Sequence, residues 1–291
     1  MRLATKAAKA EREDPPGQLL AIAPAVRRAT EILDALAEDS PRSLADLTRR
    51  LRYPKSSILK ICRALELGGL VRHDPEGYVL GQRVAELGAA YLGTVDEVRA
   101  FYQVVRAEVD AAQTVQLASL AADQRSVVHL ARRDGTRGVR LASDFGIGAP
   151  ATCTASGKAM LASLDPKSVA ELLAKGPRLI QLTRNSHATP RAVLEDLAAI
   201  RDRGYAIDDE ETTSGIICTA AVIARPSHAG GPMAVTFTVL KSETSPTQLA
   251  ALGRQVVDLA QAIAGRLGQG SARVRLEQSI ESVPDKKRHL A

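Results

Sequence analysis

Positive charge is concentrated between Arg42 and Arg63. This stretch holds seven arginine and lysine side chains and one carboxylate, Asp46, so its formal net charge of +6 equals that of the whole 291-residue chain. Lysine and arginine neutralise phosphate groups, and short hydroxyl side chains can bond phosphate oxygens. Charge that is localised in this way indicates an anionic partner such as nucleic acid.

The third helix predicted in this region would present the charge on one side. Ser56, Lys60 and Arg63 fall on the helical face opposite Ile58 and Leu65. A solvated basic face is the alternative interpretation of this pattern. Hydroxyls and long cations together on an exposed face favour a helix that lies in the major groove of double-stranded DNA. The candidate DNA contacts are Ser43, Lys55, Ser56, Ser57, Lys60 and Arg63.

Other residue types that could support catalysis or metal binding lack the spacing that such sites need. Gly157-Lys158 is not a phosphate-binding loop, because that motif requires a glycine and a hydroxyl where this chain has Thr152 and Ala159. The five histidines are scattered, with no HExxH motif and no pair four residues apart. We therefore expect no enzyme activity, no metal and no cofactor.

The three cysteines leave a second function class open. Cys62, Cys153 and Cys218 are far apart and form no CxxC pair, which argues against a disulfide framework and a structural zinc site. Accessible thiols of low pKa can sense oxidants. A redox-responsive regulator that uses Cys153 and Cys218 is therefore the alternative to a regulator that senses a metabolite.

The basic stretch lies within a series of short elements. Apolar residues at helical spacing predict one helix after Ala25, a second after the N-cap Ser43 and a third from Pro54 to the stop at Gly68-Gly69. Two extended segments, 70–72 and 77–80, flank a turn-forming tip and predict a β-hairpin. The order is helix, helix, turn, helix and hairpin.

The remainder of the chain predicts a larger unit of a different kind. Helices are expected at 82–94, 96–112, 154–164, 166–174, 190–203 and 245–267, and strands at 114–120, 126–131, 138–142, 216–224 and 233–240. Several strands with helices segregated from them indicate an α+β sheet domain.

Length and composition agree with two globular domains. The hydrophobic fraction is 45% and the charged fraction 25%, as in ordinary globular proteins, and a chain of this length corresponds to about two domains. No apolar run approaches the ~18 residues of a membrane span, and no secretory signal is visible at the N-terminus. We therefore expect a cytoplasmic protein with no membrane partner.

Several motifs resemble those of the IclR family of transcriptional regulators. Residues 43–47 (SLADL) and 53–57 (YPKSS) resemble the family's helix-turn-helix, and residues 78–81 (YVLG) resemble the end of its wing. Residues 154–159 (TASGKA) and 203–211 (RGYAIDDEE), followed by Gly215 and Cys218, resemble signatures of its C-terminal domain. The resemblance spans roughly residues 25–267, and the order and spacing of the motifs make it specific.

The resemblance implies an α+β fold with an N-terminal winged helix-turn-helix domain, a linker helix and a C-terminal GAF-like α/β sheet domain that binds an effector. We assign the DNA-binding domain to residues 25–81, the linker to 82–95 and the effector domain to 96–267. A disordered arm (1–24) and a flexible tail (268–291) are expected to flank them. The resemblance also implies homodimers that often pair into homotetramers.

In the family, a small molecule lies on the sheet of the C-terminal domain. Carried over by motif, its contacts are Leu141, Ala155, Ser156, Asp208, Cys218, Thr236 and Thr238. Thr236 and Thr238 are two residues apart on one predicted strand and therefore face the same side of the sheet. Backbone amides near Ser156 and Gly157, at the start of a helix, form a ready anion site. We therefore expect a carboxylate metabolite as the effector.

Overall fold

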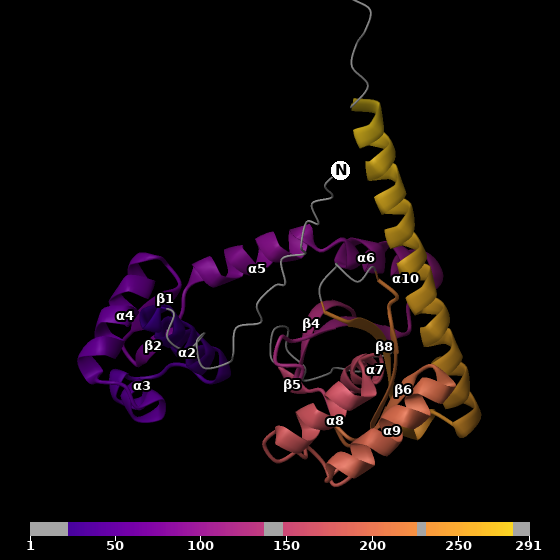
Figure 1. Cartoon of the computed structure of the whole chain (residues 1–291), viewed down its shortest axis with the longest axis horizontal. Helices are drawn as coiled ribbons and strands as arrows, with labels where there is room; N and C mark the ends of the chain where they lie inside the picture. Colours follow the sequence, from indigo (N-terminus) through magenta and orange to yellow (C-terminus); the bar gives the residue numbers. More distant parts are fainter. Residues whose placement is uncertain (1–22, 137–147, 226–230, 282–291) are drawn as a thin grey trace, which may run out of the picture. The chain divides into compact units, whose positions relative to one another are not determined.

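The structure, a computed structural model, describes residues 23–136, 148–225 and 231–281 (Figure 1). Contacts divide the chain into two units, Met1–Tyr91 and Leu92–Ala291. The division falls inside the helix that the sequence predicts as a linker. The strand predicted at 138–142 and almost all of the predicted N-terminal arm lie outside the described residues.

Three helices, a β-hairpin and a further helix make up the N-terminal unit. They are α2 (Pro24–Glu38), α3 (Leu44–Leu51), α4 (Lys55–Leu67), β1 (Val71–Asp74), β2 (Gly77–Leu80) and α5 (Gln82–Thr94). Ile32, Leu36, Leu47, Ile58 and Cys62 are buried in the core that α2, α3 and α4 share. This is a winged helix-turn-helix, as predicted, with α4 as its recognition helix and the hairpin as its wing.

Both ends of α3 are fixed by local interactions. The Ser43 hydroxyl accepts a hydrogen bond from the Asp46 amide at 3.1 Å, and the Asp46 carboxylate accepts one from the Ser43 amide at 3.3 Å, which completes a capping box. At the other end, Arg52 adopts a left-handed conformation and donates its amide to the Thr48 carbonyl at 3.0 Å. The chain then turns sharply enough for α4 to begin at Lys55, one residue later than predicted.

The C-terminal unit is built on an antiparallel sheet. In chain order its elements are α6 (Asp96–Glu108), β3 (Thr114–Leu120), β4 (Ser126–Arg133), β5 (Ala149–Pro150), α7 (Ala155–Ala162), α8 (Pro166–Lys175), α9 (Pro190–Arg203), β6 (Ala206–Asp209), β7 (Ile216–Val222), β8 (Met233–Leu240), the 3-10 helix η1 (Lys241–Glu243) and α10 (Pro246–Glu281). The strand order is β5-β4-β3-β8-β7-β6, and every described pairing is antiparallel.

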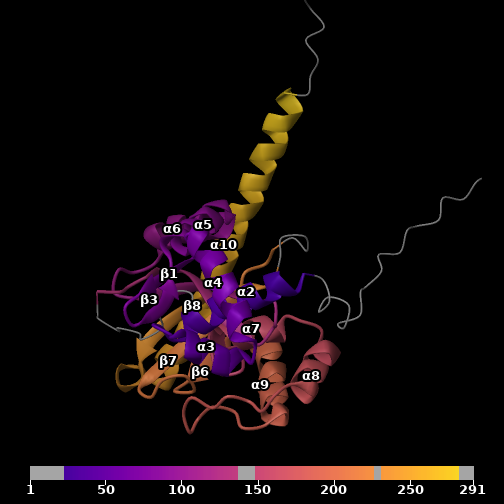
Figure 2. The same cartoon turned by 90° about the vertical axis from the view of Figure 1, so that its left-hand side faces the viewer.

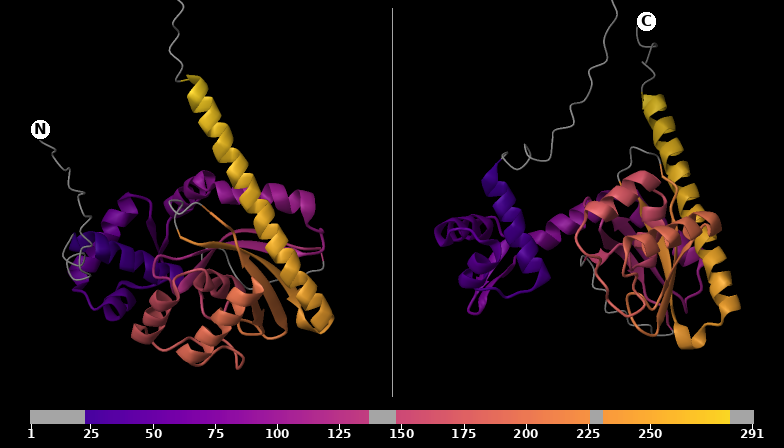
Figure 3. Two further views of the ribbon diagram at one scale, coloured as in Figure 1. Left: turned by 45° about the vertical axis from the view of Figure 1, so that its right-hand side comes forward. Right: turned by 60° about the horizontal axis from the view of Figure 1, so that its bottom comes forward.

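Helices cover both faces of this sheet (Figures 2 and 3). On one face α6 and α10 pack through Phe101, Val256 and Ile263 onto Leu117 and Phe237. On the other face α7 lies directly on the sheet, and α9 packs against α7 from outside. The residues that α7 covers include Ala118, Ala220 and Ala234. Their small side chains allow a helix to approach the strands closely.

Some predicted boundaries are wrong. The expected flexible tail is helical as far as Glu281, because α10 continues without a break past Gly268 and Gly270. Glycine favours helix ends because it readily adopts a left-handed conformation, but inside a helix it costs about 1 kcal/mol without stopping it. Strand β6 is absent from the sequence prediction, and α6 ends at Glu108 instead of 112. Among the helices of the described ranges, α10 included, none is both long and apolar enough to cross a membrane.

Candidate functional site

The recognition helix α4 separates its apolar and basic residues as the sequence predicts. Ile58, Cys62 and Leu65 are buried in the N-terminal core. The predicted contacts Lys55, Ser56, Lys60 and Arg63 are all exposed. The helix therefore presents one polar, cationic surface that could enter a DNA groove.

The other two predicted contacts already have partners within the fold. Ser57 accepts a hydrogen bond from Arg28 Nη1 at 3.1 Å, and the Arg28 guanidinium lies 4.9 Å from the centre of the Tyr53 ring. The Ser43 hydroxyl is used in the capping box with Asp46. Both hydroxyls position the two helices, and whether they also contact DNA stays a prediction.

Only part of the basic charge of the Arg42–Arg63 stretch is free to meet a ligand. Three of the seven cations are paired with carboxylates: Arg42 with Asp39 at 3.1 Å, Arg49 with Asp46, and Arg50 with Glu38. Four have no ion pair with any residue that the structure describes, namely Arg52, Lys55, Lys60 and Arg63. Arg52 is missing from the sequence-based set, because a residue in a turn has no helical face to assign it to.

The register of the sheet brings the predicted effector contacts together on the face that α7 covers. One row across β6, β7, β8 and β3 contains Asp208, Cys218, Thr238 and Thr114. The adjacent row across β7, β8, β3 and β4 contains Ala220, Thr236, Gln116 and Arg132. Paired residues of antiparallel strands point to the same side of a sheet. The polar side chains of both rows therefore share one surface.

Two buried polar atoms on this surface lack a hydrogen-bond partner among the residues that the structure describes. They are Oγ1 of Thr236, whose residue is 4% exposed, and Nδ1 of His129. Burial lowers the pKa of His129, and the nearby charge of Arg132 lowers it further. Buried polar groups in native structures are almost always hydrogen-bonded, so these two atoms indicate a place where a polar ligand or water binds.

Gln116, His129 and Arg132 are candidate contacts that the sequence analysis missed. The strand prediction ended at Ala131, and β4 contains a β-bulge: Leu117 pairs with Ala131 but Ala118 pairs with His129. A bulge inserts one residue and shifts the alternation of side chains. Strict alternation from His129 would place Arg132 on the opposite face, so only the pairing register could reveal it.

The start of α7 differs in one respect from the expected anion site. Ala155 and Ser156 are buried there, 1% and 2% exposed, as a pocket lining requires. However, the Gly157 amide donates to the Thr154 hydroxyl at 3.1 Å, the N-cap of the helix. The expectation that this amide binds a carboxylate is therefore wrong, because the cap already uses it. The amides of Ala155 and Ser156 are the remaining candidates.

Asp208 and Cys218 are buried but differ in what they offer a ligand. The Asp208 carboxylate accepts hydrogen bonds from the Glu211 and Thr212 amides, at 2.7 and 3.2 Å, and from the Thr212 hydroxyl. It therefore shapes the β6–β7 turn. Cys218 Sγ lies 3.5 Å from Thr238 Oγ1. Leu141, the remaining predicted contact, lies outside the described residues.

The redox alternative finds no support in the two thiols. Burial and the nearby Asp208 carboxylate raise the pKa of Cys218 to about 12, and burial raises the pKa of Cys153. Both residues are buried. A thiol reacts with oxidants as the accessible thiolate, so these environments oppose that chemistry.

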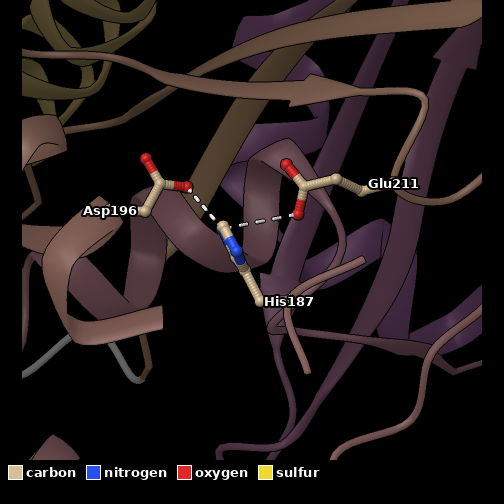
Figure 4. Close-up of side chains that lie close together, drawn as sticks. All are labelled: His187, Asp196 and Glu211. Carbon is tan, nitrogen blue, oxygen red and sulfur yellow. Dashed lines mark hydrogen bonds and ion pairs between the residues drawn. The ribbon is translucent and has the colours of Figure 1, made fainter. Parts of the chain in front are cut away.

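A buried ionic cluster stands next to the effector surface. Lys158 is 1% exposed, and its ammonium bonds Asp196 on α9 at 2.7 Å and Glu211 in the β6–β7 turn. His187 lies between the same two carboxylates, with Nε2 at 3.2 Å from Asp196 and 3.8 Å from Glu211 (Figure 4). Arg203 contacts Asp196 at 3.3 Å. The two carboxylates therefore lie close to two permanent cations, Lys158 and Arg203, in addition to His187.

The two carboxylates respond differently to this environment. Burial raises the pKa of Glu211 despite the charge of Lys158. Burial opposes ionisation of Asp196 too, but the hydrogen bond from His187 and the charge of Lys158 outweigh it and lower its pKa. His187, Asp196 and Glu211 are donors of a kind that can hold a metal ion. Because the Lys158 ammonium and the Arg203 guanidinium together already balance the two carboxylates, we assign no metal to them.

Comparison with known proteins places both units in one family. Residues 94–265 match the family described as "Bacterial transcriptional regulator IclR C-terminal", and residues 25–75 match the "IclR helix-turn-helix domain". The chain belongs to the IclR family of transcriptional regulators. It is therefore a regulator with a DNA-binding helix-turn-helix and a C-terminal effector domain, not an enzyme.

Individual relatives agree with this assignment. The chain is 34% identical over 202 residues to the HTH-type transcriptional regulator Rv1719 of Mycobacterium tuberculosis. The aligned region covers 68% of this chain and 76% of that protein. It also resembles the IclR transcriptional regulator of Alicyclobacillus acidocaldarius, with a TM-score of 0.70 at 23% identity over 83% of this chain and 98% of the other. An IclR homologue from Microbacterium hydrocarbonoxydans, crystallised with 4-hydroxybenzoate, gives a TM-score of 0.61 at 20% identity, covering 83% and 99% of the two chains.

The buried cluster explains why two IclR-like motifs occur together in this chain. Lys158 belongs to the TASGKA motif and Glu211 ends the RGYAIDDEE motif, and the two form one ion pair. Position 157 requires glycine for a steric reason, because a Cβ atom there would overlap the backbone of Ala151. The motifs therefore hold α7 against the turn that follows β6.

Lys158→Met tests the cluster, because it keeps much of the side-chain volume but removes the buried cation. We expect the free energy of unfolding to fall by about 3–5 kcal/mol at neutral pH, since a buried ion pair is broken on one side. Loss of Lys158 raises the already raised pKa of Glu211 further. The loss of unfolding free energy should therefore become smaller as the pH falls toward the pKa of a glutamate in the unfolded chain, because protonation of Glu211 removes its buried charge.

Urea unfolding at several pH values measures both effects. Lys175→Met is the matched control, because Lys175 pairs with Glu171 at 2.8 Å on the surface, with exposed fractions of 77% and 67%, and its loss should change stability little. A Lys158→Met protein as stable as wild type at neutral pH would contradict this account.

Proposed function

We propose that this regulator binds a near-palindromic operator through α4 as a homodimer, and that a small organic acid held under α7 changes its affinity for DNA. The observation that carries the effector proposal is the buried hydroxyl of Thr236, which lacks a partner among the described residues and pairs in register with Gln116. Arg132 lies next to Gln116 in the same row; its guanidinium is paired with the exposed Asp134, and an effector carboxylate would take the place of that partner.

The chemistry of this surface favours an acid with a compact apolar body. Ala118, Ala220 and Ala234, which α7 covers, surround the polar groups with apolar surface, so a ligand that enters under the helix would meet apolar side chains. The 4-hydroxybenzoate that the Microbacterium homologue was crystallised with is such a molecule. That ligand supports the class of effector and does not identify it for this chain.

The apolar side of α5 supports the homodimer. This helix buries none of its residues, and Leu87 and Tyr91 are 49% and 54% exposed, with Val84 and Gly88 on the same side. A single helix of this length is marginal in water without a packing partner. A second copy of the chain would cover the stripe and place two recognition helices on successive half-sites of DNA.

Lys60→Ala tests the DNA-binding surface. If Lys60 of each subunit neutralises one phosphate, the slope of log affinity against log salt concentration should decrease in magnitude by about 1.8 for the dimer, with a similar loss on every sequence. Titration of a labelled duplex at several salt concentrations measures the slope. Lys175→Ala, which removes an equal charge from the C-terminal unit, should leave it unchanged. An unaltered slope in Lys60→Ala would exclude this contact.

Thr236→Val tests the effector surface, because it keeps the shape of the side chain and removes only the hydroxyl. A panel of carboxylates is first screened for the compound that most raises the melting temperature of the wild-type protein. The variant should need about 5- to 150-fold more of that compound for half-maximal effect, which corresponds to one lost hydrogen bond of roughly 1–3 kcal/mol. DNA binding without the compound should persist.

Thr219→Val is a closely matched control for this experiment. Thr219 is also buried and its hydroxyl is also without a partner among the described residues, but it pairs with Phe237 and faces α6 and α10. Its replacement should not alter the response to the compound. Equal responses of wild type, Thr236→Val and Thr219→Val would show that the effector binds elsewhere.

Leu87→Glu tests the dimer, because it places a charge in the centre of the α5 stripe. Burying an unpaired carboxylate in an apolar interface is strongly unfavourable. Sedimentation should show a shift from dimer toward monomer, together with loss of tight operator binding. Glu86→Gln, an exposed change on another side of the same helix, should leave the assembly unchanged. A Leu87→Glu dimer of wild-type affinity would contradict the proposed interface.

A further inference from the structure

The residue between α3 and α4 has a backbone conformation that its side chain makes unfavourable. Arg52 has φ 56° and ψ 33°, in the left-handed region. A Cβ atom in this region approaches the following carbonyl oxygen, a contact that glycine avoids. The turn that starts the recognition helix therefore carries strain that a glycine would remove.

No interaction within the described fold compensates this strain through the Arg52 side chain. Its backbone amide caps α3, as a glycine amide would, while its guanidinium is exposed and forms no hydrogen bond or ion pair with the described residues. Glu210, another left-handed residue at φ 58°, is different. Its carboxylate bonds the Gly215 amide at 2.7 Å and Lys241 at 2.6 Å. The Arg52 side chain thus contributes charge but no contact to the fold.

The position of Arg52 indicates what this charge can meet. It lies three residues before the first residue of α4, the helix whose exposed face carries Lys55, Lys60 and Arg63. When a recognition helix enters the major groove by its N-terminal part, the preceding turn comes close to the sugar-phosphate backbone at the groove edge. A guanidinium has the reach and the paired donors to bind a phosphate there.

We propose that Arg52 binds a backbone phosphate of the operator and is a residue of the DNA interface, at the expense of stability in the free protein. The inference rests on the proposed use of α4 as the DNA-binding surface. It adds a contact in the turn that no helical pattern identifies. At position 52, glycine would therefore favour stability of the free protein, whereas arginine favours affinity for DNA.

Arg52→Gly separates the two demands, because it removes the charge and relaxes the backbone. The urea midpoint should rise. Binding to a duplex that the wild-type protein selects from a random-sequence pool should weaken about sixtyfold near 0.1 M salt, with the salt slope reduced by about 1.8, as one lost phosphate contact in each subunit of the dimer requires. A general folding defect would instead lower both stability and affinity.

Two further variants identify the cause. Arg52→Asn tolerates the left-handed conformation without charge and should bind as weakly as Arg52→Gly, whereas Arg52→Lys keeps the charge and should retain the wild-type salt slope. Wild-type slope and affinity in a folded Arg52→Gly protein would overturn the proposal. If Lys60→Ala still reduces the slope in that case, only the Arg52 contact fails. If Lys60→Ala also has no effect, the α4 surface itself is wrong.

Discussion

The buried ammonium of Lys158 is the interaction on which the C-terminal unit depends. It joins α7, α9 and the turn after β6 through bonds to Asp196 and Glu211. A buried lysine is costly unless its charge is matched, and here two carboxylates from distant parts of the chain match it. Any movement of α7 would separate these charges, so the helix is held at one distance from the sheet.

That fixed distance makes the surface under α7 usable as a binding site. Where the sheet presents alanines, α7 packs closely. Where it presents Thr236 beside Gln116 and Arg132 in one row, the Thr236 hydroxyl has no hydrogen-bond partner among the described residues. A ligand that bonds these side chains would press on α7, and the ionic cluster would transmit the force to α9 and the β6–β7 turn.

The sequence predicts local structure in this protein well and long-range pairing poorly. Helices α2, α3, α4 and α5 and strands β3 and β8 lie close to their predicted positions, because periodicity, caps and glycine stops are local properties. Strand β6 is absent from the sequence prediction, because Asp208 and Asp209 carry no apolar alternation. Its pairing with β7 defines it instead. The Lys158 cluster has the same origin: its carboxylates are 38 and 53 residues away along the chain.

Charge in the N-terminal unit is divided between folding and recognition. The fold pairs Arg42, Arg49 and Arg50 with carboxylates of α2, α3 and the loop between them, and the Arg50–Glu38 pair joins α3 to α2. The cations around the start and exposed face of α4 are left without such partners, and like charges held close together repel and destabilise the free domain. DNA phosphates would neutralise these cations and remove the repulsion between them. Part of the binding free energy would therefore come from relief of an unfavourable electrostatic energy that the unbound protein already has. Operator DNA should therefore stabilise this unit by mass action as it binds, since the unfolded chain cannot hold the charges in the same arrangement.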